Sequence, residues 1–178
     1  FSDKEFRELK TVVSQWYDSN KSLPMLKVLF RDKVKNIKLS KITDTMDLLN
    51  ILFAHGHLSS QNLGILCDTI SITEHLGLLS KIKEKLPSFP DVKEGTISTK
   101  FTPLRQKLIK FGMVLTPADV KQIDGTYNTP CKEYTDGWSM ITDLENRLKI
   151  SKGKLEEFIG SLETLNLPLA INALTEGL

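Results

Sequence analysis

The sequence predicts an all-α protein built from two tandem helical bundles. The first observation is an internal repeat, because residues 44–70 and 136–162 match without a gap, 92 positions apart. The second is the helical spacing of apolar residues, with no alternating stretch that would indicate a strand. The third is the stretch 86–98, whose two prolines and one glycine interrupt the helical spacing between the two copies. A repeat of this length fits a small domain rather than a solenoid unit. We expect domains at 1–87 and 99–178, joined by a linker at 88–98.

The two copies of the repeat share identities as well as apolar positions. The first reads DTMDLLNILFAHGHLSSQNLGILCDTI and the second DGWSMITDLENRLKISKGKLEEFIGSL. Further pairs, such as Leu49/Ile141, are apolar in both copies. The identical pairs are Asp44/Asp136, Leu52/Leu144, Ser59/Ser151 and Leu63/Leu155.

Apolar spacing and end signals predict six helices in the first copy. Pro24 fits the first turn of a helix, Gly56 fits a helix end, and Ser59 fits the cap of helix five. The basic run 31–41 predicts a loop with a short third helix. The other expected helices cover 3–18, 22–31, 44–54, 60–71 and 73–85.

The second copy follows the same order. Its stretch 101–111 places apolar residues where 6–16 places them, so the copy starts with an equivalent helix. Thr116 and the proline after it predict a cap and a first helical residue. Ser151 is expected to cap helix five, and the Asn-Leu-Pro stretch 166–168 to start the last helix. We therefore expect a second bundle of about six helices.

Composition excludes several classes of protein. The net charge is +2, with 24 basic and 22 acidic residues, which argues against a nucleic-acid-binding protein. Residues 1–90 carry a net +3 and residues 91–178 a net −1, too small a difference to identify a partner. The two cysteines, Cys67 and Cys131, exclude a dense disulfide scaffold and favour a reducing, cytoplasmic compartment.

The sequence shows no signal peptide and no apolar run long enough to cross a membrane, so we expect a protein without a membrane partner. It starts at Phe1 rather than at a methionine. We expect it to be a fragment of a longer protein, whose flanks hold further function.

Two motifs in the first copy carry a resemblance to a known family. Leu26–Leu29, Leu-Lys-Val-Leu, matches a helix-two signature, and Asp47–Leu52 followed by Leu58–Leu63 matches a signature of helices four and five. On these residues the first copy resembles a death effector domain of the death-fold superfamily. The stretch 138–162 resembles the same family more distantly. The chain looks like a tandem death effector domain, as in caspase-8-type initiator caspases and FLIP-like inhibitors.

The resemblance implies two six-helix death-fold bundles and a role in assembly with other death effector domain proteins. In the family a hydrophobic pair on helix two inserts into a neighbour, and it falls here on Val28 and Leu29. An exposed aliphatic pair anchors an interface through buried area. In the second copy this pair becomes Gly125-Thr126, so that copy uses a different face or packs against the first.

The family's charge network is incomplete in both copies. Its Arg-x-Asp-Leu motif on helix six falls on His75–Leu78 and on Asn166–Leu169. Its helix-two acid falls on Ser22 in the first copy and on Asp119 in the second. These departures suggest a distant or invertebrate-like homologue, or a viral or decoy-like one.

Each candidate residue also has a structural interpretation. Val28 and Leu29 are core residues if helix two is buried, and His75 is a solvated helix residue or a pH-sensitive contact. The run containing Arg31 and Lys33 is a solvated loop or an electrostatic contact with an acidic domain. Asp119 fits capping as well as binding. The expected partner-binding residues are Val28, Leu29, Arg31, Lys33, His75 and Asp119.

Enzyme chemistry is not expected in this chain. His55 and His57 flank a glycine without further ligands nearby, a poor pattern for a metal site. Phosphate-binding loops, paired acids and nucleophile–base pairs are absent from the sequence. We expect no catalytic residue, cofactor or metal. The expected function is a non-enzymatic module for homotypic assembly in apoptosis or innate immune signalling, which recruits or regulates an initiator caspase. The alternatives are a FLIP-like decoy and a generic helical scaffold for an unrelated partner.

Overall fold

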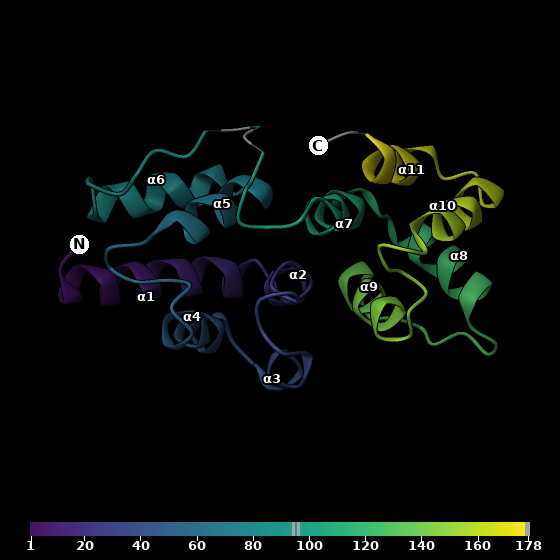
Figure 1. Cartoon of the computed structure of the whole chain (residues 1–178), viewed down its shortest axis with the longest axis horizontal. Coiled ribbons are helices and arrows are strands. Elements are labelled where there is room, and N and C mark those ends of the chain that lie inside the picture. The colour runs from purple at the N-terminus through teal and green to yellow at the C-terminus, as the bar shows by residue number, and fades with distance from the viewer. Residues whose placement is uncertain (94, 96, 177–178) are drawn as a thin grey trace. The chain divides into compact units, whose positions relative to one another are not determined.

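The computed structural model describes residues 1–93, 95 and 97–176, and this part of the chain is all-α (Figure 1). It contains eleven helices and no strand beyond one isolated bridge between Ser59 and Asn62. The all-α prediction is confirmed. The chain divides into two compact units, Phe1–Thr102 and Pro103–Leu178.

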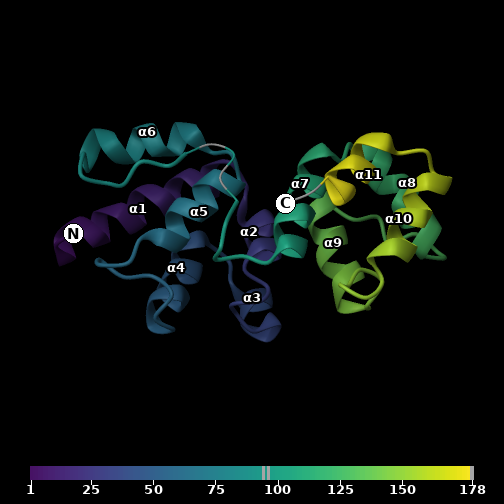
Figure 2. The same ribbon diagram turned by 45° about the horizontal axis from the view of Figure 1, so that its top comes forward.

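The first unit contains six helices, and its longest, α1, packs on α4 and α6 (Figures 1 and 2). A capping box between Ser2 and Glu5 starts α1, and Phe6, Leu9 and Val13 recur on its buried face. The α5 helix packs on α6. The helices are α1 (Asp3–Ser19), α2 (Leu23–Leu29), α3 (Asn36–Lys41), α4 (Thr45–Ala54), α5 (Gly64–Ile72) and α6 (Leu76–Lys85).

Two phenylalanines downstream of α6 also belong to the first unit. Phe89 is buried and meets the ring of Phe1 edge-on, with centroids 6.3 Å apart. Phe101 is buried against Phe30, with centroids 5.3 Å apart. The sequence places Phe101 at the start of the second copy, but the structure packs it in the first unit.

The second unit contains five helices in its described part. The α7 helix packs on α9 and α11, α8 packs on α9, and α10 packs on α11 (Figure 2). The rings of Phe111 and Phe158 meet edge-on in the core, with centroids 5.5 Å apart. The helices are α7 (Pro103–Val114), α8 (Pro117–Tyr127), α9 (Gly137–Asn146), α10 (Leu155–Thr164) and α11 (Pro168–Thr175).

A loop at 128–135 takes the place of helix three in the second unit, so the expectation of six helices there is wrong. Buried Asp124 holds this loop by accepting bonds from the backbone N–H groups of Lys132 (2.9 Å) and Glu133 (2.8 Å). It also accepts a bond from the side chain of Asn128 (2.8 Å). A carboxylate thus satisfies donors that a helix would pair with its own carbonyls.

The repeat extends to the backbone. The starts of α4 and α9 are 92 residues apart, as are those of α6 and α11. After α4 the chain passes through Gly56 at φ 78°, and after α9 through Leu148 at φ 58°. Glu74 (φ 56°) and Asn166 (φ 55°) form a second left-handed pair at the same spacing. The two units therefore share the course of three consecutive helices and of the turns between them.

The predicted serine caps of helix five are wrong, and the structure instead shows aspartate caps on helix four of each copy. Asp44 accepts a bond from Asp47 N–H, and Asp136 from Ser139 N–H. The α5 helix starts only at Gly64, and the Ser59 hydroxyl instead accepts a bond from Gln61 N–H. In the second copy α10 starts at Leu155, after a turn closed by the Ser151 carbonyl.

Candidate interaction surface

The aliphatic pair on α2 is buried rather than exposed. Val28 is 1% exposed and Leu29 is 0% exposed. The α2 helix has only seven residues, and it also buries Met25 and Leu26. A helix that is apolar on nearly all sides is a core helix. The expectation of an exposed pair is therefore wrong, and the core interpretation applies.

The basic residues after α2 are engaged in local contacts. Lys33 Nζ lies 5.2 Å from the centroid of the Phe101 ring, which is a cation–π distance. Arg31 Nη1 donates a 3.5 Å bond to Asn36 Oδ1. This stretch is thus tied to the first unit rather than being a freely solvated loop.

His75 lies between aromatic rings at the start of α6. Its ring centroid is 5.1 Å from that of Tyr17 and 6.3 Å from that of Trp16. Its Nδ1 is buried and has no hydrogen-bond partner in the described part of the chain. Burial lowers the pKa of the His75 imidazole. His75 is a packed residue in the first unit rather than a solvated one.

Asp119 is a capping residue in the second unit. Its N–H donates to Thr116 Oγ1 at 3.1 Å, and its carboxylate accepts from Thr116 N–H at 3.0 Å. These bonds form a complete capping box for α8. The structure therefore brings Val28 and Leu29 together only as core, and it gives His75 and Asp119 structural contacts.

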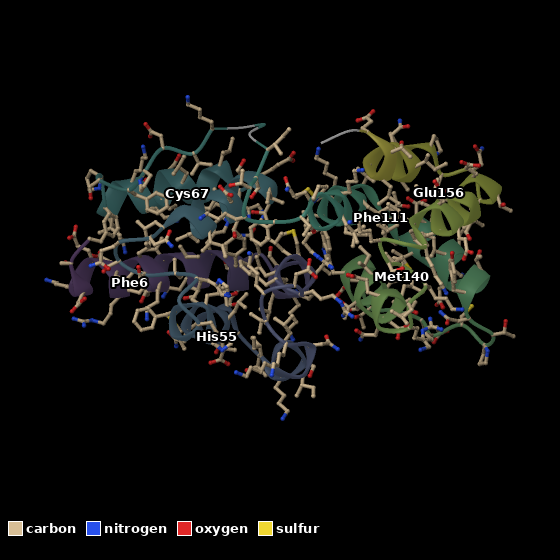
Figure 3. The ribbon with its side chains drawn as sticks, viewed as in Figure 1. Phe6, His55, Cys67, Phe111, Met140 and Glu156 are labelled. Atoms are coloured by element: carbon tan, nitrogen blue, oxygen red, sulfur yellow. The ribbon has the colours of Figure 1, made fainter. Side chains whose placement is uncertain are left out.

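A groove lies between α3 and α4 on the surface of the first unit. Ile37 on α3 is 72% exposed beside it. Lys38 Nζ lies 3.3 Å from His55 Nε2, so two of the lining side chains contact each other; Figure 3 marks His55. Ile42 at the end of α3 is buried. The lining residues are Lys38, Lys41, Ile42, Asp47, Asn50, Ile51, Ala54 and His55.

The α4 helix also exposes an aromatic ring beside α1. Phe53 is 52% exposed, and its centroid lies 5.7 Å from that of Phe6. Lys10 Nζ lies 5.7 Å from the Phe53 centroid and donates a 3.1 Å bond to Asn50 Oδ1. Asn50 lines the groove, so this basic side chain reaches its edge.

Sequence reasoning missed this groove, although a signal was present. Leu48, Leu49 and Leu52 suffice to give α4 a buried face. Ile51 and Phe53 are additional apolar residues on the same short helix. A helix with more apolar residues than its core face needs presents some of them to solvent or to a partner.

The polar clusters of the second unit hold its elements together. Arg105 and Glu145 form a buried bidentate ion pair between α7 and α9, with N–O distances of 2.7 and 2.9 Å. Asp143 accepts bonds from Tyr134 (2.5 Å) and Arg147 (3.2 Å). Burial raises the pKa of Asp143, but these bonds and the nearby cations outweigh it, so the pKa is lowered.

The described residues include neither a candidate metal site nor a candidate membrane-spanning helix. No group of three or more His, Cys, Asp or Glu side chains there is placed to hold a metal ion. No helix there is both long and apolar enough to cross a bilayer.

Comparison with known proteins assigns no family. No protein-family model matches the sequence. A search of curated proteins also finds no match.

Proposed function

We propose that this chain is a cytoplasmic, non-enzymatic interaction module of the tandem death effector domain type. In this proposal it assembles with other death effector domain proteins in apoptosis or innate immune signalling, and it recruits or regulates an initiator caspase. The first unit is a six-helix death fold, and the second is a divergent copy in which a loop replaces helix three.

The observation that carries this proposal is the repetition of a whole helical unit. Three helices and two left-handed turns recur 92 residues apart, in a chain whose first copy holds the motifs at Leu26–Leu29 and Leu58–Leu63. Duplicated small helical domains suit the presentation of binding surfaces better than the formation of one substrate pocket. The surplus apolar residues of α4 supply a surface for such contacts.

A decoy role is a second form of the same proposal. The helix-six positions that carry the family's charges hold His75–Leu78 and Asn166–Leu169 here. His75 packs on Tyr17 rather than reaching a neighbour. A module that enters an assembly but lacks one set of contacts terminates its growth, which is how a FLIP-like inhibitor would act.

Co-assembly in cells tests the proposal. The chain, fused to a fluorescent protein, is expressed with an adaptor death effector domain that carries a second colour. We expect both colours in the same assemblies, and no recruitment by a caspase recruitment domain, which is a different death-fold class. Separate, diffuse distributions of the two proteins would contradict the proposal.

Reconstituted caspase activation separates recruitment from the decoy role. Purified chain is added to an adaptor and a full-length initiator caspase, and cleavage of a peptide substrate is followed. A recruiting module raises the rate, whereas a decoy lowers it as its concentration rises. An unchanged rate at saturating binding would contradict both forms.

A further inference from the structure

We infer that the α3–α4 groove of one molecule receives the α10–α11 face of a second copy of this chain. This inference deepens the proposed function and rests on it, because it assigns the surfaces through which the module self-associates. It is drawn from charge and exposure on the two units, each taken by itself.

The groove is the basic partner. The stretch 31–41 carries five basic residues and one acid, a net +4. Lys38 and Lys41 line the groove, and both side chains are exposed. Asp47, in the first turn of α4, is the acid among the lining residues, whereas His55 lies at the other end of that helix. The exposed Ile37 supplies apolar area beside the lysines.

The last two helices are the acidic partner. Residues 155–178 hold four acids and no lysine, arginine or histidine, a net −4. Glu156, Gly160 and Glu163 follow one another at i, i+4 and i+7, so they lie along one face of α10, and all three are exposed. Figure 3 marks Glu156 on this helix. A Cβ added at Gly160 would meet no atom within 4 Å, so this face is open to a partner.

Apolar anchors accompany the charges on both sides. Leu169 on α11 is 67% exposed, and Ile37 on α3 is 72% exposed. An interface needs apolar area at its centre and complementary charge around it. The groove and the acidic face supply both, with opposite charges of equal size in the two stretches.

The contact joins two different surfaces and is therefore heterologous. Each molecule in such a contact keeps one free groove and one free acidic face, so association continues into chains or rings. The assemblies formed by such a module grow as the protein concentration rises, and the association weakens as salt screens the charges.

Charge reversal tests the inference on the full chain. Sedimentation velocity over a range of protein concentrations, at low and at high salt, compares the wild type with two variants. One is K38E/K41E in the groove, and the other is E156K/E163K on α10. We expect the wild type to associate at low salt, and each variant to weaken association by at least about tenfold.

The combined variant K38E/K41E/E156K/E163K provides the rescue. The charges of both surfaces are then reversed, so the attraction between them returns. We expect an association constant within about threefold of that of the wild type. The matched control is K81E/K85E on α6, which changes the net charge as much as K38E/K41E but lies outside the groove. Circular dichroism confirms that each variant keeps its helical content.

Three results would overturn the inference: a wild type that is monomeric at low salt, a groove variant no weaker than the α6 control, or a combined variant that stays dissociated. A monomeric chain that still joins adaptor assemblies in cells overturns the self-contact alone and leaves the proposed function standing. Loss of adaptor binding, but not of self-association, in K38E/K41E would show that an adaptor occupies the groove instead.

Discussion

At the scale of single residues, the candidate positions divide by what surrounds them. Val28, Leu29 and His75 face the interior, and Asp119 faces its own helix end. Their side chains are therefore expected to affect stability before they affect binding. His75 leads to one prediction at this scale, and the buried ion pair of the second unit leads to another.

The stability of the first unit should fall in mild acid because of His75. Burial lowers the pKa of this imidazole in the folded protein, whereas in the unfolded chain it is about 6.5. The unfolded chain therefore binds the proton first. The free energy of unfolding is fully present above about pH 6.5 and decreases as the pH falls below it.

Urea unfolding at about pH 7.5 and about pH 5.5 measures this dependence. His75→Phe keeps a ring between Tyr17 and Trp16 but removes the titratable imidazole. The pH dependence of the free energy of unfolding should therefore become smaller. His55→Gln, at an exposed position, is the control and should keep it. A wild type equally stable at both pH values would contradict the assignment. Burial also lowers the pKa of His57, which leaves a residual dependence of the same sign in the variant.

Removing one charge of the Arg105–Glu145 pair should destabilise the second unit strongly. The two side chains are only 3% and 6% exposed. Glu145→Gln leaves a buried guanidinium uncompensated, at a cost of about 3–5 kcal/mol. Lys132→Gln removes a partly exposed partner of Asp143 and should cost less than about 1 kcal/mol. Hydrogen exchange of the α7 and α9 amides measures the loss of stability in each variant. Equal protection in the two variants would contradict the prediction.

At the scale of helices and turns, the duplicated unit provides its own internal comparison. Gly56 and Leu148 occupy equivalent left-handed turns, at φ 78° and 58°. Glycine adopts this conformation without strain, whereas an L-residue with a side chain pays a steric penalty. Leu148 is 62% exposed, so little packing offsets the strain.

Exchanging these two residues should have opposite effects on stability. Leu148→Gly relieves strain and should raise the free energy of unfolding of the second unit by up to about 1 kcal/mol. Gly56→Leu should lower that of the first unit by about 1–2 kcal/mol, although a Cβ there meets no atom within 4 Å. Urea unfolding measures both changes. Destabilisation by Leu148→Gly would show that its side chain contributes packing that exposure does not reveal.

Helices were predictable where spacing and end signals agreed. The α1 helix, with its regular apolar face, and α4, which ends just before Gly56, lie within a residue of the expected ranges 3–18 and 44–54. In the second copy a loop replaces helix three, and the sequence did not predict this loop. The loop depends on Asp124, which accepts hydrogen bonds from residues eight and nine positions further along the chain. The Ser59 cap failed because the chain makes a turn before α5 starts.

The candidate surface was less predictable than the fold, because exposure depends on packing between helices. The motif at Leu26–Leu29 identified α2, yet a helix of seven residues between other elements has no free side. Conversely, Ile37 and Ile51 resemble core residues in the sequence, and only the structure shows that Ile37 is exposed and that Ile51 lines the groove.

At the scale of the whole molecule, the chain consists of two related helical units with different surface chemistry. The first is basic around its α3–α4 groove, and the second ends in two helices without a basic residue. The two units share their helical repeat, but the groove of the first is basic and the last two helices of the second are acidic. Such a chain suits assembly through unlike surfaces, which is the basis of both proposals.

Direct binding of the purified chain to the tandem death effector domain of an initiator caspase tests the central claim most directly. Labelled caspase domain is titrated with the full chain and followed by sedimentation velocity, with a caspase recruitment domain of similar net charge as control. We expect a saturable complex with the death effector domain and none with the control. Absence of a complex with either, or equal binding to both, would contradict it.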